Sequence, residues 1–305
     1  LERMVDYLKN LKFSETDIAY LRELDYPEDF LNYLKELRFT GTVRAMQEGQ
    51  LAFANEPLVQ VEGSLAECQL VETAILNILN HQSLIATKAA RICYAAEGDG
   101  IMEFGLRRAQ GPDAGIYGAR AAVIGGCAGT SNVLTGQMFD VPVMGTHAHS
   151  WIMSFDDEYT AFYTYAKLYP MACTLLVDTY DTLNSGVPNA IKVFKQIKKE
   201  GIELKNYGIR LDSGDLAYLS KKARKMLDDA GFKDATITAS NDLDEFLIAR
   251  LKMQGAEITN WGVGTNLITS KDCPSFGGVY KLAAIMEDGE NFTPKIKLSD
   301  NSEKI

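Results

Sequence analysis

Small and polar residues follow several apolar runs of this sequence, and their types suit the binding of phosphate groups. The candidates for direct phosphate contacts are Ser240, Asn241, Gly262, Gly264 and Thr265. Glycine-rich turns present backbone N–H groups to phosphate oxygens, and Arg107 or Arg108 can add a bidentate guanidinium. Each residue taken singly also has a structural explanation, such as a tight turn or a solvated charge. Together they predict a site for a sugar phosphate.

Two carboxylates in the run DSGD, Asp212 and Asp215, are candidate ligands for Mg²⁺ and hydrogen-bond partners for ribose hydroxyls. Either of them can instead be the N-cap of the helix that follows. The sequence contains neither the GxGxxG fingerprint nor the GxxxxGKS/T loop. Neither a Rossmann dinucleotide site nor a Walker-type ATP site is therefore predicted.

His149 differs in its surroundings from the other two histidines. It follows a Gly-Thr turn, it precedes Ser150, and a carboxylate at another strand end, Asp178, can orient it. A neutral imidazole among phosphate-binding loops can act as a nucleophile toward a phosphoryl group. For His147 and His81 we expect a hydrogen-bonded structural role instead.

These residues need a parallel sheet to bring them to one edge. We expect strands at residues 101–104, 126–131, 141–145, 174–178, 207–212, 236–240 and 260–264. We expect helices between several of them, at residues 157–167, 187–200, 216–230 and 242–254. Strands alternating with helices predict right-handed crossovers, and so many repeats favour a barrel whose chemistry lies at the carboxyl ends of its strands.

The preceding part of the chain has a different pattern. Residues 1–40 predict short helices, with a capping box at 14–17, and strand-like runs follow at 42–49, 51–57 and 58–63. A long helix is expected from about residue 65 to 96, with a break near His81. This part of the chain therefore predicts a small α+β unit.

Composition excludes several classes of protein. The 305 residues carry 31 basic and 41 acidic side chains, a net charge of −10, which disfavours nucleic acid and anionic membranes as partners. Apolar runs are far shorter than the roughly 18 residues of a membrane span. The five cysteines have no CxxC spacing, so a cytoplasmic protein without a disulfide framework is expected. We also expect that both ends of a longer protein are missing.

From about residue 70 to 281 the sequence strongly resembles the nicotinate phosphoribosyltransferases of the bacterial type. The matching runs are EFGLRRAQGPD (103–113), GTSNVLTG (129–136), VPVMGTHAHSW (141–151), LLVDTYDT (175–182), IRLDSGDL (209–216), TASNDLDE (238–245) and WGVGTNLITS (261–270). Their combination and order are much more specific than any single run.

The resemblance implies an α/β fold, the irregular and incomplete TIM-like barrel of a type II phosphoribosyltransferase with a second, smaller α/β domain. We expect residues 1–68 in the smaller domain, 69–270 in the barrel, and 271–305 returning to the smaller domain. The family joins nicotinate to 5-phosphoribosyl-1-pyrophosphate with coupled ATP hydrolysis, using Mg²⁺, and gives nicotinate mononucleotide for NAD biosynthesis. A homodimer is also implied.

Residue roles follow from the resemblance in the same way. His149 looks like the histidine that ATP phosphorylates, and Asp178 looks like its partner. Phe104, Thr174 and Arg210 look like pyridine-site residues, with Phe104 stacking on the ring and Arg210 facing the carboxylate. The residues that look like contacts of the ribose phosphate and pyrophosphate are Arg107, Asp212, Ser240, Asn241, Gly262, Gly264 and Thr265.

Three alternatives remain at this point. A nicotinamide-specific relative is disfavoured because Ser131 stands where such enzymes carry an aspartate that accepts from the amide. If the protein were a phosphate-binding barrel isomerase or lyase, a catalytic Lys or Glu would be expected at a strand end. No convincing candidate is found. A non-catalytic fragment that binds phosphoribosyl ligands is the third.

Overall fold

The computed structural model describes residues 1–287 and 289–298. Contacts divide the chain into a first unit, Leu1–His81 with Ser275–Ile305, and a second unit, Gln82–Pro274. Helix α5 (Glu72–Ala95) begins in the first unit and ends in the second. The predicted domain limits at residues 68 and 270 stay predictions, because a unit defined by contacts is not by itself an independently folding domain.

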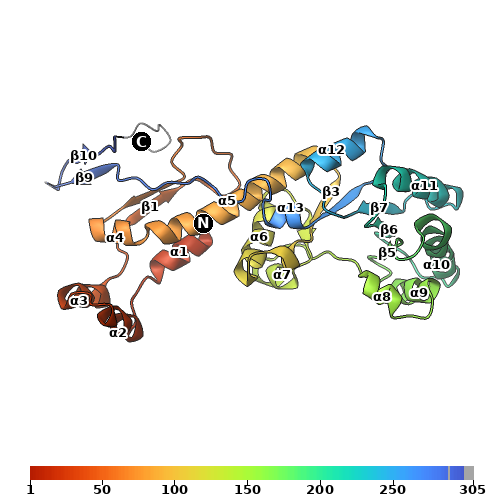
Figure 1. The fold of residues 1–305 in the computed structure, drawn as a ribbon, viewed down its shortest axis with the longest axis horizontal. Helices are drawn as coiled ribbons and strands as arrows, with labels where there is room; N and C mark the ends of the chain where they lie inside the picture. Colours follow the sequence, from red (N-terminus) through yellow and green to blue (C-terminus); the bar gives the residue numbers. More distant parts are fainter. Residues whose placement is uncertain (288, 299–305) are drawn as a thin grey trace. The chain divides into compact units, whose positions relative to one another are not determined.

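The second unit is built on a six-stranded parallel sheet in the order β4-β3-β8-β7-β6-β5. Figure 1 labels β3, β5, β6 and β7 of this sheet. The strands are β3 (Gly100–Glu103), β4 (Gly129–Thr130), β5 (Thr174–Leu176), β6 (Gly208–Leu211), β7 (Thr236–Ala239) and β8 (Asn260–Val263). The predicted α/β fold class is confirmed. The strand expected at 141–145 is reduced to a single parallel bridge between Val143 and Thr130, beside the β4 edge.

Helices follow most of these strands. They are the 3₁₀ helix η1 (Leu106–Arg108), α6 (Pro112–Ile124), α7 (Val133–Phe139), α8 (His149–Met153), α9 (Glu158–Leu168), the π-helix η2 (Thr182–Gly186), α10 (Val187–Lys199), α11 (Leu216–Asp229), α12 (Glu245–Met253) and α13 (Thr265–Ile268). The four helices predicted in this region are present, with ends shifted by up to three residues.

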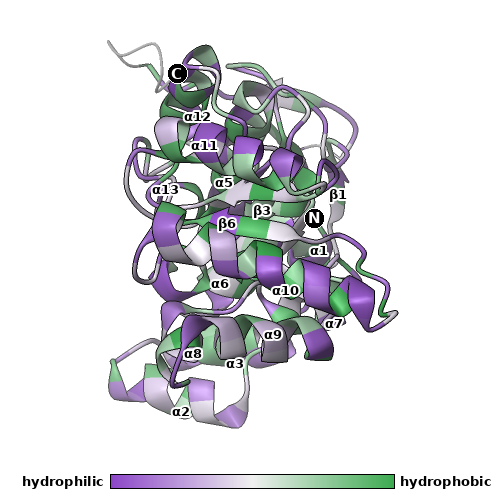
Figure 2. Cartoon of the chain, turned by 90° about the vertical axis from the view of Figure 1, so that its right-hand side faces the viewer, coloured by the Kyte–Doolittle hydropathy of each residue, from purple (hydrophilic) through white to green (hydrophobic). Residues whose placement is uncertain are grey.

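The helices have one apolar face, which packs in the core of the second unit. In α10 the residues Val187, Ala190, Val193, Phe194 and Ile197 are fully buried, with the three- and four-residue spacing of one helix face. Figure 2 shows the result as purple and green residues alternating along α10 and α11. Trp261 of β8 and Phe162 of α9 are also fully buried in this core. The core fixes the strands, and thereby the loops that follow them.

The first unit contains α1 (Glu2–Lys9), α2 (Glu15–Glu23), α3 (Glu28–Glu36), α4 (Leu65–Leu70) and the antiparallel pairs β1 (Thr42–Ala45) with β2 (Val59–Glu62) and β9 (Ala284–Met286) with β10 (Phe292–Pro294). The capping box at Ser14 is present. The strand expected at 51–57 is wrong, because the chain turns there and Asn55 has a left-handed φ of 68°. The break expected near His81 is also wrong, because α5 is continuous.

Within the described residues, the structure has no helix with the length and hydropathy of a membrane span.

Candidate active site

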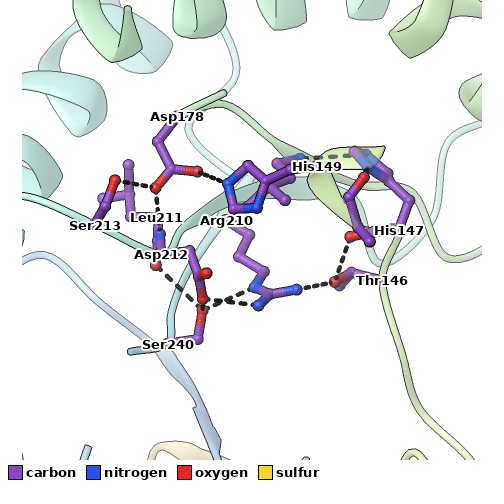
Figure 3. A network of polar contacts seen from close by, with 11 residues as sticks. Thr146, His147, His149, Asp178, Arg210, Leu211, Asp212, Ser213 and Ser240 are labelled. Atoms are coloured by element: carbon purple, nitrogen blue, oxygen red, sulfur yellow. Dashed lines mark hydrogen bonds and ion pairs between the residues drawn. The ribbon is translucent and has the colours of Figure 1, made fainter. Parts of the chain in front are cut away.

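Arg210 is the centre of a polar cluster at the carboxyl ends of β5, β6 and β7 (Figure 3). Its Nε donates to Ser240 Oγ at 2.8 Å, its Nη1 donates to Thr146 Oγ1 at 2.7 Å, and its Nη2 pairs with Asp212 Oδ1 at 2.8 Å. Ser240 Oγ also donates to Asp212 Oδ1. The parallel register of β6 and β7 brings Asp212 and Ser240, which follow these strands, close together. The three hydrogen bonds of Arg210 fix the plane of its guanidinium.

His149 and Asp178 form a second part of the cluster. His149 is the first residue of α8, and its Nε2 lies 3.1 Å from Asp178 Oδ1. The other oxygen of Asp178 accepts from the Asp212 N–H at 2.9 Å and from Ser213 Oγ at 2.6 Å. The Asp178 side chain is 1% exposed, whereas that of His149 is 39% exposed. A buried, fixed carboxylate therefore orients an imidazole that a ligand can reach.

His147 has the structural position that was expected for it. It is buried, its Nε2 accepts from the Leu176 N–H at 3.3 Å, and its ring contacts the edge of Tyr165 at a centroid distance of 4.6 Å. Burial lowers the pKa of His147 to about 4, so the ring is neutral at pH 7. Burial also lowers the pKa of His81, which lies in α5. The hydrogen bond expected for His81 is not found at Nε2, which is buried without a partner among the described residues.

Phe104 follows β3 and forms an aromatic wall next to Arg210. The Arg210 Cζ atom lies 5.8 Å from the centroid of the ring. The Phe104 N–H donates to Val263 O at 2.8 Å, which ties it to β8. A Cβ atom at Gly262 would lie 2.7 Å from the ring, so only glycine allows the ring to lie against this strand.

Most of the predicted phosphate contacts follow three neighbouring strands, β3, β8 and β7, whereas Gly262 lies within β8 and Asp212 follows β6. Arg107 is exposed in η1, Gly264 precedes α13, and Asn241 has a left-handed φ of 97°. Thr265 is the first residue of α13. The topology therefore gathers the predicted residues at one edge of the sheet.

Asn266 lies in a run that carried the resemblance, but the sequence predicted no role for it. It is buried, and its Nδ2 donates to the main-chain oxygens of Asp242 at 2.8 Å and Leu243 at 3.0 Å. It thereby joins the loop after β8 to the loop after β7. Thr146 and Ser213 were also missed, although both lie inside the runs that carried the resemblance. Only the folded chain shows that their hydroxyls contact Arg210 and Asp178.

The two candidate magnesium ligands have different surroundings. Asp215 is the N-cap of α11, since its Oδ1 accepts from the Tyr218 N–H at 3.0 Å, whereas Asp212 pairs with Arg210. The described ranges contain no group of three or more His, Cys, Asp or Glu residues arranged to hold a metal. Mg²⁺ is commonly held by one or two carboxylates together with phosphate oxygens. The residues therefore fit an ion that arrives with a phosphorylated substrate.

Two predicted pyridine-site residues have contrasting positions. Ser131 follows β4, is half-buried, and donates its N–H to Glu103 O at 3.0 Å. Thr174 is the first residue of β5 and pairs with Gly208 at the amino end of the sheet. At about 3.3 Å per residue, it lies roughly 13 Å along the chain from Asp178. The structure does not bring Thr174 into the cluster, and its predicted role stays a prediction.

Comparison with known proteins identifies the family of this chain. Residues 1–80 match the model of the nicotinate phosphoribosyltransferase (NAPRTase) N-terminal domain, and residues 100–305 match that of the NAPRTase family. Nicotinate phosphoribosyltransferase of Bacillus subtilis is 56% identical over 100% of this chain and 61% of its own length. Nicotinate phosphoribosyltransferase pncB2 of Mycobacterium tuberculosis is 45% identical over 93% of this chain and 60% of its own length. The chain thus spans about three fifths of these relatives.

Solved structures show the same relationship. The crystal structure of human nicotinic acid phosphoribosyltransferase superposes with a TM-score of 0.79 at 33% identity, covering 87% of this chain and 64% of that one. The structure of nicotinate-nucleotide pyrophosphorylase from Pyrococcus furiosus has a TM-score of 0.64 at 31% identity, covering 75% of this chain and 57% of that one. Sequence, fold and strand-end residues lead to one conclusion: the chain belongs to the nicotinate phosphoribosyltransferase family.

Proposed function

We propose that the complete protein joins nicotinate to 5-phosphoribosyl-1-pyrophosphate, with coupled hydrolysis of ATP. The products are nicotinate mononucleotide, pyrophosphate, ADP and phosphate, and the mononucleotide is a precursor for NAD biosynthesis. The observation that carries the proposal is the placement of Arg210 beside Phe104 at the carboxyl edge of the sheet. We further propose that the enzyme is a cytoplasmic homodimer, as in the family that the sequence resembles.

Arg210 and Phe104 suit an aromatic ring that carries a carboxylate. A guanidinium has five N–H donors, and Arg210 uses three of them on Ser240, Thr146 and Asp212. One donor remains on each terminal nitrogen, and these two can bind the nicotinate carboxylate in a bidentate way. Phe104 would then stack on the pyridine ring, in an offset arrangement that aromatic pairs favour.

The transfer step is a displacement at the anomeric carbon of the ribose. The pyridine nitrogen uses its lone pair to form the N–C bond while the bond from this carbon to pyrophosphate breaks, so pyrophosphate leaves with the electron pair. No general base is needed, because the nitrogen carries no proton. The loops of Arg107, Asn241 and Gly264 would hold the phosphate groups, and Asp212 would hydrogen-bond the ribose. Mg²⁺, held by Asp212 or Asp215 with phosphate oxygens, would neutralise charge on the leaving group.

His149 is suited to accept the phosphoryl group of ATP. When its Nε2–H donates to Asp178, the lone pair of the imidazole is on Nδ1. Nδ1 would attack the γ-phosphorus, the bond to ADP would break, and water would later cleave the N–P bond to release phosphate. The phosphohistidine adds about two negative charges next to the substrate loops, and can order them around Mg²⁺.

An assay of the complete protein tests this function. With nicotinate, 5-phosphoribosyl-1-pyrophosphate, Mg²⁺ and ATP, we expect equal amounts of nicotinate mononucleotide and pyrophosphate. Arg210→Gln should lower kcat/KM for nicotinate by roughly 100-fold or more, since a charge-assisted bidentate contact is lost. A complete protein that binds 5-phosphoribosyl-1-pyrophosphate but forms no mononucleotide would favour the non-catalytic alternative.

A further inference from the structure

Glu103 is a fully buried carboxylate that the proposed reaction does not use. It is the last residue of β3 and is 0% exposed. Burial raises the pKa of its carboxyl group, while hydrogen bonds from Thr130 and Gly105 act in the opposite direction. A carboxylate is retained in a core only when its oxygens are hydrogen-bonded, so its partners indicate what it does.

The two oxygens of Glu103 hold two different loops. Oε1 accepts from the main-chain N–H of Gly105, and Oε2 accepts from Thr130 Oγ1 at 2.6 Å. Thr130 is itself fully buried, and its Oγ1 accepts from the Asn132 N–H at 3.0 Å. The main-chain oxygen of Glu103 also accepts from the Ser131 N–H at 3.0 Å. One buried residue therefore links the loop after β3 to the loop after β4.

These bonds lie on both sides of the two residues that line the proposed pyridine site. Phe104 lies between Glu103 and Gly105, and Ser131 lies between Thr130 and Asn132. Packing leaves little freedom at this point, because a Cβ atom at Gly105 would lie 2.5 Å from Ile268 and 2.8 Å from Glu103 Oε1. The close approach of the carboxylate to the Gly105 N–H thus requires glycine.

We propose that Glu103 is a positioning residue for nicotinate: through Gly105 and Thr130 it sets Phe104 and Ser131 relative to Arg210. The inference rests on the proposed function. None of these hydrogen bonds involves the loops assigned to phosphate contacts after β7 and β8. Arg107 shares the loop after β3 but lies two residues beyond Gly105, so we expect Glu103 to have its larger effect on the pyridine side. A shift of about 1 Å at a reacting ligand can cost roughly 100-fold in rate, so such a link has a measurable effect.

Thr130 offers a matched pair of variants in the complete protein. Thr130→Val keeps the shape of the side chain but removes the hydroxyl, so Glu103 Oε2 and the Asn132 N–H lose their partner. Thr130→Ser keeps the hydroxyl. We expect Thr130→Val to raise the nicotinate KM roughly 10-fold or more, with a smaller change in kcat and the KM for 5-phosphoribosyl-1-pyrophosphate within about threefold of wild type. Thr130→Ser should stay near wild type in all three quantities.

Glu103 itself gives the second test, which does not depend on the Thr130 variants. Glu103→Gln retains an oxygen for the Gly105 N–H, but its amide would donate to Thr130 Oγ1 and leave the buried Thr130 hydroxyl proton without its acceptor, so the nicotinate KM should lie between those of wild type and Glu103→Ala. Glu103→Ala should raise the nicotinate KM by about as much as Thr130→Val does. An unchanged nicotinate KM in Glu103→Ala and Thr130→Val, equal increases in both substrate KM values, or a Gln variant as weak as Ala would overturn the inference. Absence of nicotinate turnover by the wild-type protein would instead refute the proposed function.

Discussion

His149 Nε2 and Asp178 Oδ1 lie 3.1 Å apart, and the second oxygen of this carboxylate is held by the loop after β6. The histidine is thus oriented by a group that is itself fixed by Asp212 and Ser213. This relationship couples the proposed phosphorylation site to the loop of Asp212, the proposed ribose contact. When Nε2–H donates to Asp178, the lone pair of the ring is on Nδ1, the nitrogen that we propose as the nucleophile.

The phosphorylation of His149 is the first prediction. Incubation of the complete protein with labelled ATP should give an acid-labile phosphate on this residue, attached through Nδ1. His149→Ala should abolish the label. Asp178→Asn should slow its formation roughly 100-fold, because the amide can hold the His149 imidazole in the tautomer whose lone pair is on Nε2 instead of Nδ1. His81→Gln is the control and should label normally. Label that survives His149→Ala unchanged would reject the assignment.

Arg107 should act on the phosphate substrate. Arg107→Ala removes a charged donor from the loop after β3, so the KM for 5-phosphoribosyl-1-pyrophosphate should rise roughly 10- to 100-fold. The KM for nicotinate should change little. Arg108→Ala, in the neighbouring exposed position of η1, is the matched control and should have a smaller effect. Equal weakening of both substrates by Arg107→Ala would indicate a folding defect instead.

Ser131 should determine the choice between acid and amide. Placing an unpaired carboxylate against nicotinate in a partly dry site costs on the order of 2–4 kcal/mol. Ser131→Asp should therefore lower kcat/KM for nicotinate by about 30- to 1000-fold while sparing the affinity for 5-phosphoribosyl-1-pyrophosphate. Ser131→Asn is the neutral control of similar size. If the Asp and Asn variants lose nicotinate activity equally, bulk rather than charge explains the loss.

His147 should make the folded state sensitive to acid. Its pKa is about 4 in the folded protein, against 6.5 for an exposed histidine. Between these values the unfolded chain binds a proton that the folded chain does not, so the free energy of unfolding should fall by about 3 kcal/mol as the pH decreases from 6.5 to 4.

Urea unfolding of the wild type and of His147→Gln at several pH values measures this contribution. The glutamine carbonyl can still accept from the Leu176 N–H, but it does not titrate. The free energy of unfolding of the wild type should therefore fall more steeply than that of His147→Gln as the pH decreases from 6.5 to 4. Parallel stability curves would show that His147 contributes nothing to the acid sensitivity.

The sequence predicts which loops form the site because parallel strands bring their carboxyl ends to one edge. It does not predict which hydroxyl meets which charge. Asp212 and Asp215 share one short run, yet one pairs with Arg210 and the other caps α11, since the turn at Gly214 with φ 78° separates them. The burial of Glu103 is likewise set by the loops that close over it. The residues next to Glu103 in the sequence do not indicate that this charged residue at the end of β3 is buried.

The substrate of the complete protein tests the central claim most directly. Nicotinate and nicotinamide at equal concentration compete in one reaction with 5-phosphoribosyl-1-pyrophosphate, Mg²⁺ and ATP, and mass spectrometry measures the two mononucleotides. Arg210 attracts a carboxylate and Ser131 adds no charge, so nicotinate mononucleotide should be formed in large excess. Equal or greater formation of nicotinamide mononucleotide would contradict this account of the pocket.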